Sequence, residues 1–151
     1  MIRAPLPADL PDLCRLFSQL GYTQNEDGLR RRLHQTLTDP ACIMRVHQGP
    51  NRVVDGVIVM HLMRPLHEPH DWALISSLVV DEAVRGGGVG AQLLAETELL
   101  ASLAGCARVM LASNETREDA HRFYERHGYQ ERRKRFVKML TPTPMDKKRP
   151  A

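Results

Sequence analysis

The sequence has 151 residues, of which 42% are hydrophobic and 26% are charged, with a formal net charge of +3 and a pI near 9.0. This length suits one domain with a single substantial core, and the hydrophobic content excludes a chain that stays disordered throughout. The mild positive charge suits an anionic ligand but is too small to argue for nucleic acid, and no apolar run is long enough to predict a membrane span.

The first residues predict a short strand and a helix. Residues 1–4 are a weak strand candidate that ends at prolines. Apolar residues then recur at three- and four-residue spacing, which predicts a helix that Asp9 caps and Gly21 ends. Its predicted inward face consists of Leu10, Leu13, Cys14, Phe17 and Leu20.

A second helix is predicted over residues 26–38, after Asn25. Its expected inward residues are Leu29, Leu33 and Leu37. Because these leucines fix the buried side, the arginines at 30–32 are predicted to form a solvated face rather than a nucleic-acid site.

Residues 42–46 and 53–63 predict two strands that are joined by the turn-rich residues 48–51. The proline-broken residues 64–71 then predict a loop where a substrate could be recognised. His67 and His70 in this loop have a spacing found in metal sites, but the prolines deny them a helical scaffold and no third ligand is near. We therefore expect no metal there.

A strand over residues 72–80 leads into a glycine-rich loop. Glycines 86–88 and 90 can adopt positive φ, so backbone N–H groups can point together at an anion, while the helix start that follows adds unpaired donors. Arg85 adds a full charge beside them. This pattern predicts a phosphate-binding loop.

Two common phosphate motifs do not fit this loop. A mononucleotide P-loop needs a lysine directly after its glycines, and none is present. A dinucleotide fingerprint needs an acidic residue at the end of the next strand, but that strand ends at Leu111 without one. The pattern that remains is Arg85-x-x-Gly88-x-Gly90.

The residues after the loop predict a helix and a strand. The helix carries an apolar stripe and ends at Gly105, and its stripe consists of Val89, Leu93, Thr97, Leu100 and Ala104. A strand over residues 106–112 follows. Strand-helix-strand order with a right-handed crossover predicts that this strand runs parallel to the strand over 72–80.

A second motif lies downstream, in a helix that Thr116 is predicted to cap. It reads Ala120-His121-Arg122-Phe123-Tyr124-Glu125-Arg126-His127-Gly128-Tyr129. Together, and in this order, the two motifs resemble the acetyl-CoA-binding loop and the Phe-Tyr segment of the GNAT superfamily of N-acetyltransferases. The resemblance covers residues 2–140, with dense motifs only over 78–129.

The resemblance implies an α/β (α+β) fold with a mixed, mostly antiparallel sheet of about seven strands, about four helices and splayed central strands. Residues 136–140 are predicted to be the last strand. Residues 1–140 would form a single acetyltransferase domain, and residues 141–151 a disordered tail.

The implied activity is transfer of an acetyl group from acetyl-CoA to a primary amine of a small molecule, by direct attack through a tetrahedral intermediate. Tyr124 would protonate the leaving thiolate, and the Leu78 N–H would polarise the thioester carbonyl. The residues implied to bind acetyl-CoA are Leu78, Val79, Val80, Arg85, Gly86, Gly87, Gly88, Val89, Gly90, Ala91, Asn114, Arg117 and Tyr124.

The general base departs from a common pattern of the superfamily. Many members carry an acidic residue on the central strand, where this chain has Ser76 and Ser77. The nearest titratable candidates are His61, His67, Glu68 and His70, and a histidine, with an ordinary pKa near 6.5, suits proton transfer at neutral pH. The alternative is that solvent takes the proton, or that the amine arrives neutral.

Three scattered cysteines, Cys14, Cys42 and Cys106, predict buried, reduced thiols and a cytoplasmic protein without a covalent nucleophile. The motifs look most like those of small-molecule members, such as aminoalkylphosphonate or aminoglycoside acetyltransferases. The alternatives are an enzyme for protein or peptide amines, another acyl donor, or a non-catalytic acetyl-CoA-binding module. Nucleic acid and membrane partners are not expected, and dimers are frequent in the superfamily.

Overall fold

The structure is a computed structural model, and it describes residues 1–22, 25–112, 118–132 and 135–142. The chain forms two compact units, Met1–Thr116 and Arg117–Ala151. Each unit is described by itself below.

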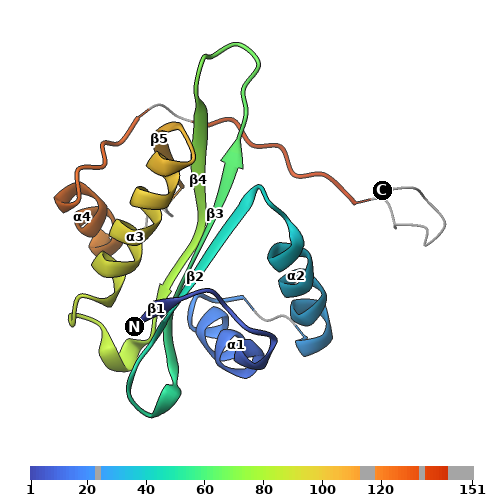
Figure 1. Ribbon diagram of the computed structural model, residues 1–151, viewed down its shortest axis with the longest axis vertical. Coiled ribbons are helices and arrows are strands. Elements are labelled where there is room, and N and C mark those ends of the chain that lie inside the picture. Colours follow the sequence, from blue (N-terminus) through green and yellow to red (C-terminus); the bar gives the residue numbers. More distant parts are fainter. Residues whose placement is uncertain (23–24, 113–117, 133–134, 143–151) are drawn as a thin grey trace. The chain divides into compact units, whose positions relative to one another are not determined.

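The first unit is built on one five-stranded sheet with the strand order β1-β2-β3-β4-β5 (Figure 1). Its strands are β1 (Ile2–Arg3), β2 (Cys42–Gln48), β3 (Val54–Met63), β4 (Asp71–Val80) and β5 (Cys106–Leu111). The pairs from β1 to β4 are antiparallel, and β4 pairs with β5 in parallel. The predicted mixed, mostly antiparallel sheet and its parallel last pair are therefore confirmed.

Three helices pack on this sheet: α1 (Leu10–Gln19) and α2 (Glu26–Thr38) lie on one face, and α3 (Val89–Leu103) lies on the other (Figure 1). One core cluster joins the first two helices to the sheet, and it includes Leu13, Leu16, Leu33, Val46 and Val57. On the opposite face α3 approaches β3 at Gly56. A Cβ there would lie 2.8 Å from Val89 Cγ1 and 2.9 Å from Leu93 Cδ1, so a larger residue would force these side chains of α3 to shift.

The helix limits follow from local chemistry. α2 begins after Asn25, whose side chain accepts a hydrogen bond from the Gly28 N–H (2.6 Å), and it spans the predicted residues. Leu37 was predicted to face inward, but it is 40% exposed because only Leu29 and Leu33 reach the sheet.

The prediction that the Asp9 side chain caps α1 is wrong. Asp9 stands at the N-cap position but makes no side-chain capping bond. Its carboxylate instead accepts hydrogen bonds from the Arg3 guanidinium (both 2.8 Å) and from the Leu6 N–H (2.7 Å). An ion pair with Arg3, six residues earlier in the chain, thus takes the place of the expected capping bond.

In the second unit, α4 (Glu118–Arg126) ends in a Schellman motif. Gly128 has φ +89°, the Tyr129 N–H donates to the Tyr124 carbonyl (3.0 Å), and the Gly128 N–H donates to the Glu125 carbonyl (3.1 Å). The four predicted helices are therefore confirmed, while the predicted N-cap Thr116 lies outside the described residues.

The prediction of about seven strands is wrong for the part of the chain that the structure describes, which holds five. The predicted last strand over residues 136–140 takes no regular secondary structure, and Phe136 is fully exposed. A run of apolar residues alone does not make a strand, because the backbone groups of a strand must pair with a neighbouring strand. Most of the predicted tail, residues 143–151, lies outside the described residues.

Over the described ranges, no helix combines the length and the apolar character that crossing a membrane requires.

Candidate functional site

The glycine loop lies between the end of β4 and the start of α3. Gly86 and Gly88 have φ values of +88° and +86°, a region that side-chain-bearing residues rarely adopt. The Cβ position of each has no neighbour within 4 Å, so the backbone conformation, not crowding, requires glycine at both positions.

The loop presents backbone donors at the start of a 15-residue helix. The first helical hydrogen bond runs from the Gln92 N–H to the Gly88 carbonyl (3.0 Å), so the N–H groups of Val89, Gly90 and Ala91 precede it. Such donors and the positive end of the helix dipole favour an anion. The loop therefore suits an anionic group such as a phosphate.

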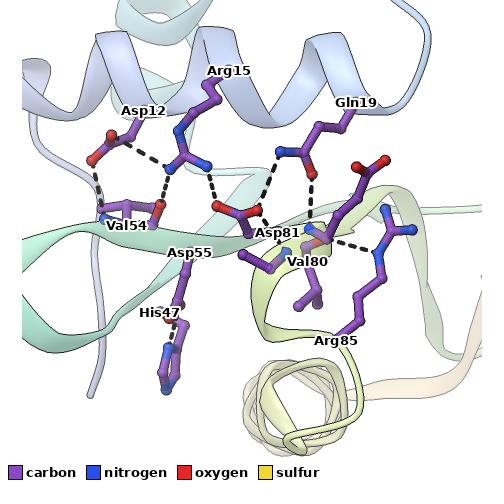
Figure 2. A network of polar contacts seen from close by, with 11 residues as sticks. Asp12, Arg15, Gln19, His47, Val54, Asp55, Val80, Asp81 and Arg85 are labelled. Carbon is purple, nitrogen blue, oxygen red and sulfur yellow. Dashed lines mark hydrogen bonds and ion pairs between the residues drawn. The ribbon is translucent and has the colours of Figure 1, made fainter.

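Arg85 is exposed, and its Nε donates to the carbonyl oxygen of Val80 (3.1 Å) (Figure 2). This bond ties the start of the loop to the last residue of β4. The predicted positions Leu78 and Val80 are half-buried, whereas the side chain of Val79 is in the core. Any role of these three residues toward a ligand would therefore belong to their backbone groups.

A polar network from α1 holds the entrance of the loop (Figure 2). Asp81 pairs with Arg15 and accepts hydrogen bonds from Gln19 (3.3 Å) and from the Ala83 N–H (3.1 Å). Gln19 also accepts a hydrogen bond from the Glu82 N–H (3.0 Å). The hydrogen bond from Ala83, followed by those from Gln19 and Arg15, holds the pKa of Asp81 below its usual range.

The same helix is fixed to β3. Arg15 donates to the Val54 carbonyl (2.8 Å), and the Val54 N–H donates to Asp12 (3.0 Å). Next to them the buried Asp55 contacts His47 Nδ1 (2.5 Å), and its carbonyl accepts from the Asp81 N–H (2.8 Å). Sequence reasoning missed this network, because its members lie 39 to 66 residues apart where α1 meets the sheet.

The strand β4 is irregular at its middle. Val59 of β3 pairs with Ser77 and Met60 pairs with Ile75, so Ser76 is the extra residue of a β-bulge. The ladder between β4 and β5 ends at Ile75 and Leu111, although β4 continues to Val80. Within the described residues, the second half of β4 thus pairs with β3 alone, as splayed central strands require.

A pocket of about 410 Å³ lies where the bulge meets α1 and α2. Its apolar wall comes from both helices and the sheet and includes Leu13, Phe17, Leu29, Leu33, Met44 and Val59. Its polar groups are Tyr22, Arg32, Thr36, His61, Ser76 and Ser77. A concave, mostly apolar site with a few convergent polar groups is typical of small-molecule binding.

His61 is the base candidate that lines this pocket. Its Nε2 lies 2.7 Å from the Ser76 hydroxyl, within hydrogen-bond distance. The two residues are 15 positions apart and meet because β3 and β4 are antiparallel neighbours. The structure thus brings together a histidine and the bulge serine that the sequence had marked separately.

The other base candidates lie outside the pocket. Glu68 accepts hydrogen bonds from Trp72 Nε1 (2.7 Å) and from Arg108 (3.0 Å), and Arg108 also stacks on the Trp72 ring, 4.0 Å from its centroid. The Trp72 hydrogen bond, with Arg108, holds the pKa of Glu68 below its usual range. Both carboxylate oxygens of Glu68 are thus engaged by Trp72 and Arg108. His67 and His70 are exposed loop residues.

The cysteine thiols are free, and none of them lines the pocket. Burial raises the pKa of Cys42 and of Cys106, which keeps both thiols protonated and weakly nucleophilic at neutral pH. In the part of the chain that the structure describes, no three His, Cys, Asp or Glu side chains gather as a metal site would need.

Tyr124 lies in the second unit, on α4. Its ring meets those of Phe123 and Tyr129 edge to face, with centroids 5.3 Å and 5.8 Å apart. The predicted cofactor contacts Asn114 and Arg117 lie outside the described residues.

The mixed five-stranded sheet and the glycine loop after β4 together define an α/β fold with a strand-to-helix loop that is suited to an anion. A family model described as an acetyltransferase (GNAT) domain matches residues 41–131, more than half of the chain. The chain therefore belongs to the GNAT family of acetyltransferases, which use acetyl-CoA as co-substrate.

One relative and two solved structures illustrate the similarity. The relative is the aminoalkylphosphonate N-acetyltransferase of Salmonella typhimurium (strain LT2), 37% identical over 129 residues, which are 85% of this chain and 80% of the relative. The structures are a transcriptional regulator from Bacillus halodurans C-125 (TM-score 0.84, 20% identity, 93% of this chain and 99% of that one) and a GNAT family acetyltransferase from Staphylococcus aureus (TM-score 0.79, 24% identity, 93% and 98%). At these identities the two structures support the fold alone.

Proposed function

We propose that the enzyme transfers an acetyl group from acetyl-CoA to the primary amine of a small molecule that binds in the pocket beside β4. The observation that carries the proposal is the His61–Ser76 pair, which lines this pocket at the bulge of the strand that leads into the glycine loop. Donor and acceptor would then meet on β4.

Acetyl-CoA supplies the acetyl thioester when bound. The residues that would hold it are the glycine loop, with the backbone N–H groups of Val89, Gly90 and Ala91, and the backbone of Leu78, Val79 and Val80. These three residues lie in the half of β4 that pairs with β3 alone among the described strands. Arg85 would add charge for the phosphates. The positive φ values of Gly86 and Gly88 support this assignment, because they shape the loop around an anion.

The proton of the amine would leave through Ser76. An ammonium group hydrogen-bonded to the Ser76 oxygen passes its proton to that oxygen as the Ser76 hydroxyl proton moves to His61 Nε2. The amine becomes a neutral nucleophile, and His61 becomes positively charged. A serine alone is too weak a base, so the relay needs the histidine.

Tyr124 would donate the proton that the departing thiolate needs, since a phenol does so without bringing a charge into the site. No cysteine takes part, in keeping with the protonated thiols of Cys42 and Cys106. The acetyl group would therefore pass directly from donor to amine.

The first acceptor class to test is the one that the Salmonella relative's name gives, aminoalkylphosphonates. A thiol-release assay with acetyl-CoA would compare aminophosphonates, polyamines, aminoglycosides, amino acids and peptides, with an amine-free blank. We expect release above the blank with at least one small amine. Release with peptides alone would overturn the small-molecule assignment.

The competing function is a non-catalytic acetyl-CoA-binding module. It is favoured if acetyl-CoA raises the melting temperature while no amine releases thiol. The His61–Ser76 pair argues against it, because a module that only binds the cofactor has no need of a proton acceptor.

A further inference from the structure

The charge of the pocket carries information about the acceptor. Among the described residues that line it, Arg32 and His61 are the basic side chains, and no aspartate or glutamate contributes. Pockets that bind polycations commonly place carboxylates against the ammonium groups, since a charge removed from water needs a partner. This pocket offers the opposite sign.

Arg32, unlike Arg30 on the same helix, has no protein partner among the described residues. No described residue forms an ion pair or side-chain hydrogen bond with it. Arg30, on the same helix, pairs with Glu26 (3.3 Å) and Asp27 (2.7 Å). The guanidinium of Arg32 thus keeps its five donors available at the pocket.

The position of Arg32 follows from helical spacing. Leu29 and Thr36 lie three and four residues from Arg32 along α2, and both also line the pocket, as does the adjacent Leu33. Leu29 and Leu33 are buried, whereas Arg32 is exposed. The side chains of Arg30, Arg31 and Arg32 are exposed, which confirms the prediction of a solvated arginine face. That prediction did not anticipate that Arg32 lines the pocket.

We infer that Arg32 binds an anionic group of the acceptor while the acceptor's amine meets Ser76 and His61. The inference rests on the proposed function, which makes this pocket the acceptor site. A guanidinium forms paired hydrogen bonds with a phosphonate or carboxylate, and these are stronger beside an apolar wall than in bulk water. The acceptor class is therefore a small amine that carries an anion a short chain away, and polyamines and aminoglycosides are disfavoured.

The test compares the parent enzyme with Arg32→Gln and with Arg31→Gln, a matched control. Arg31 precedes Arg32 on α2 and is equally exposed, but it does not line the pocket. The acceptors are 2-aminoethylphosphonate, its carboxylate counterpart β-alanine, and n-propylamine, which carries no anionic group.

We expect Arg32→Gln to lower kcat/KM for 2-aminoethylphosphonate about 10- to 100-fold, the range of a lost charge-assisted hydrogen bond. The loss should lie mostly in KM, because the anion binds equally in the ground and transition states. Rates with n-propylamine should not change, Arg31→Gln should match the parent, and Arg32→Lys should retain part of the affinity.

Equal effects of Arg32→Gln and Arg31→Gln on an active parent would overturn the inference, as would a parent that prefers polyamines to 2-aminoethylphosphonate. A second readout separates this inference from the proposed function. Binding of 2-aminoethylphosphonate is measured calorimetrically in the presence of coenzyme A, without turnover. If no amine is acetylated but Arg32→Gln still abolishes this binding, the proposed function fails and the anion site stands.

Discussion

At the residue scale, Tyr124 is fixed by the end of its own helix. Gly128 adopts φ +89°, which lets the Tyr129 N–H reach the Tyr124 carbonyl and brings the two rings into edge-to-face contact. An apolar contact between these two positions commonly accompanies a Schellman motif. The glycine of the Phe-Tyr segment thus acts on the orientation of the tyrosine.

If Tyr124 is the general acid, Tyr124→Phe should lower kcat by roughly 10²- to 10⁴-fold and leave acetyl-CoA affinity nearly unchanged. Steady-state rates and calorimetric binding would measure the two effects. Phe123→Leu, which changes the neighbouring ring instead, is the control for packing. Near-normal turnover in a folded Tyr124→Phe variant would show that Tyr124 contributes to packing and is not the general acid.

The proposed base predicts a pH profile. With His61 as proton acceptor, kcat/KM of the parent should rise with pH and level off once the acceptor is neutral. His61→Gln should remove this rise, while His67→Gln, on the exposed loop, should keep it. Persistence of the rise in both variants would show that another group or solvent takes the proton.

At the scale of elements, α3 starts and ends at glycines in the same conformation. Gly88 before the helix and Gly105 after it have φ values of +86° and +89°, and an added Cβ would meet nothing within 4 Å at either position. Alanine should therefore strain both sites alike, by about 1–2 kcal/mol. The two glycines differ only in that Gly88 belongs to the glycine loop.

This symmetry gives a matched pair of variants. Gly88→Ala should weaken or abolish the stabilisation by acetyl-CoA, which for the parent is about 2.7 kcal/mol at a hundred times the dissociation constant. Gly105→Ala should lower the melting temperature similarly without ligand but keep the ligand-induced rise. Equal ligand-induced rises in both variants would place acetyl-CoA elsewhere.

At the scale of the whole molecule, the partly buried ion pair between Arg3 and Asp9 makes the free energy of unfolding depend on pH in the acidic range. The Arg3 hydrogen bonds hold the pKa of Asp9 below its usual range, and burial only partly opposes this effect. Because the folded pKa is depressed, the unfolded chain binds more protons on acidification. This stabilisation is present above pH 4 to 5 and is lost as pH falls toward the lowered pKa of Asp9.

Asp9→Asn should therefore reduce the free energy of unfolding at pH 7 by about 2 kcal/mol, the range of hydrogen bonds to a charged group. It should also flatten the fall of stability between pH 5 and 3, measured by urea unfolding at each pH. Asp27→Asn is the control, because that carboxylate is 79% exposed in a surface pair with Arg30 and should have little effect. Parallel pH curves for the parent and Asp9→Asn would contradict the linkage.

Local features could be predicted from the sequence because they depend on neighbouring residues. The Asn25 cap, the limits of α2, and the strand-loop-helix order around Gly88 follow from side-chain capping, periodicity and the φ values that glycine permits. The two GNAT motifs, spaced along the chain, also indicated the family before any fold was known.

Only the tertiary structure decided which side chains and strands contact one another. Asp9 is a residue type that commonly caps helices, but its carboxylate forms an ion pair with Arg3 instead. The apolar residues 136–140 have no described strand to pair with. His61 reaches Ser76 through the register of two strands, and Arg32 reaches the same pocket from α2. The sequence by itself determined the glycine loop, because that loop is local, whereas the pocket between α1, α2 and the sheet depends on contacts between distant segments that only folding brings together.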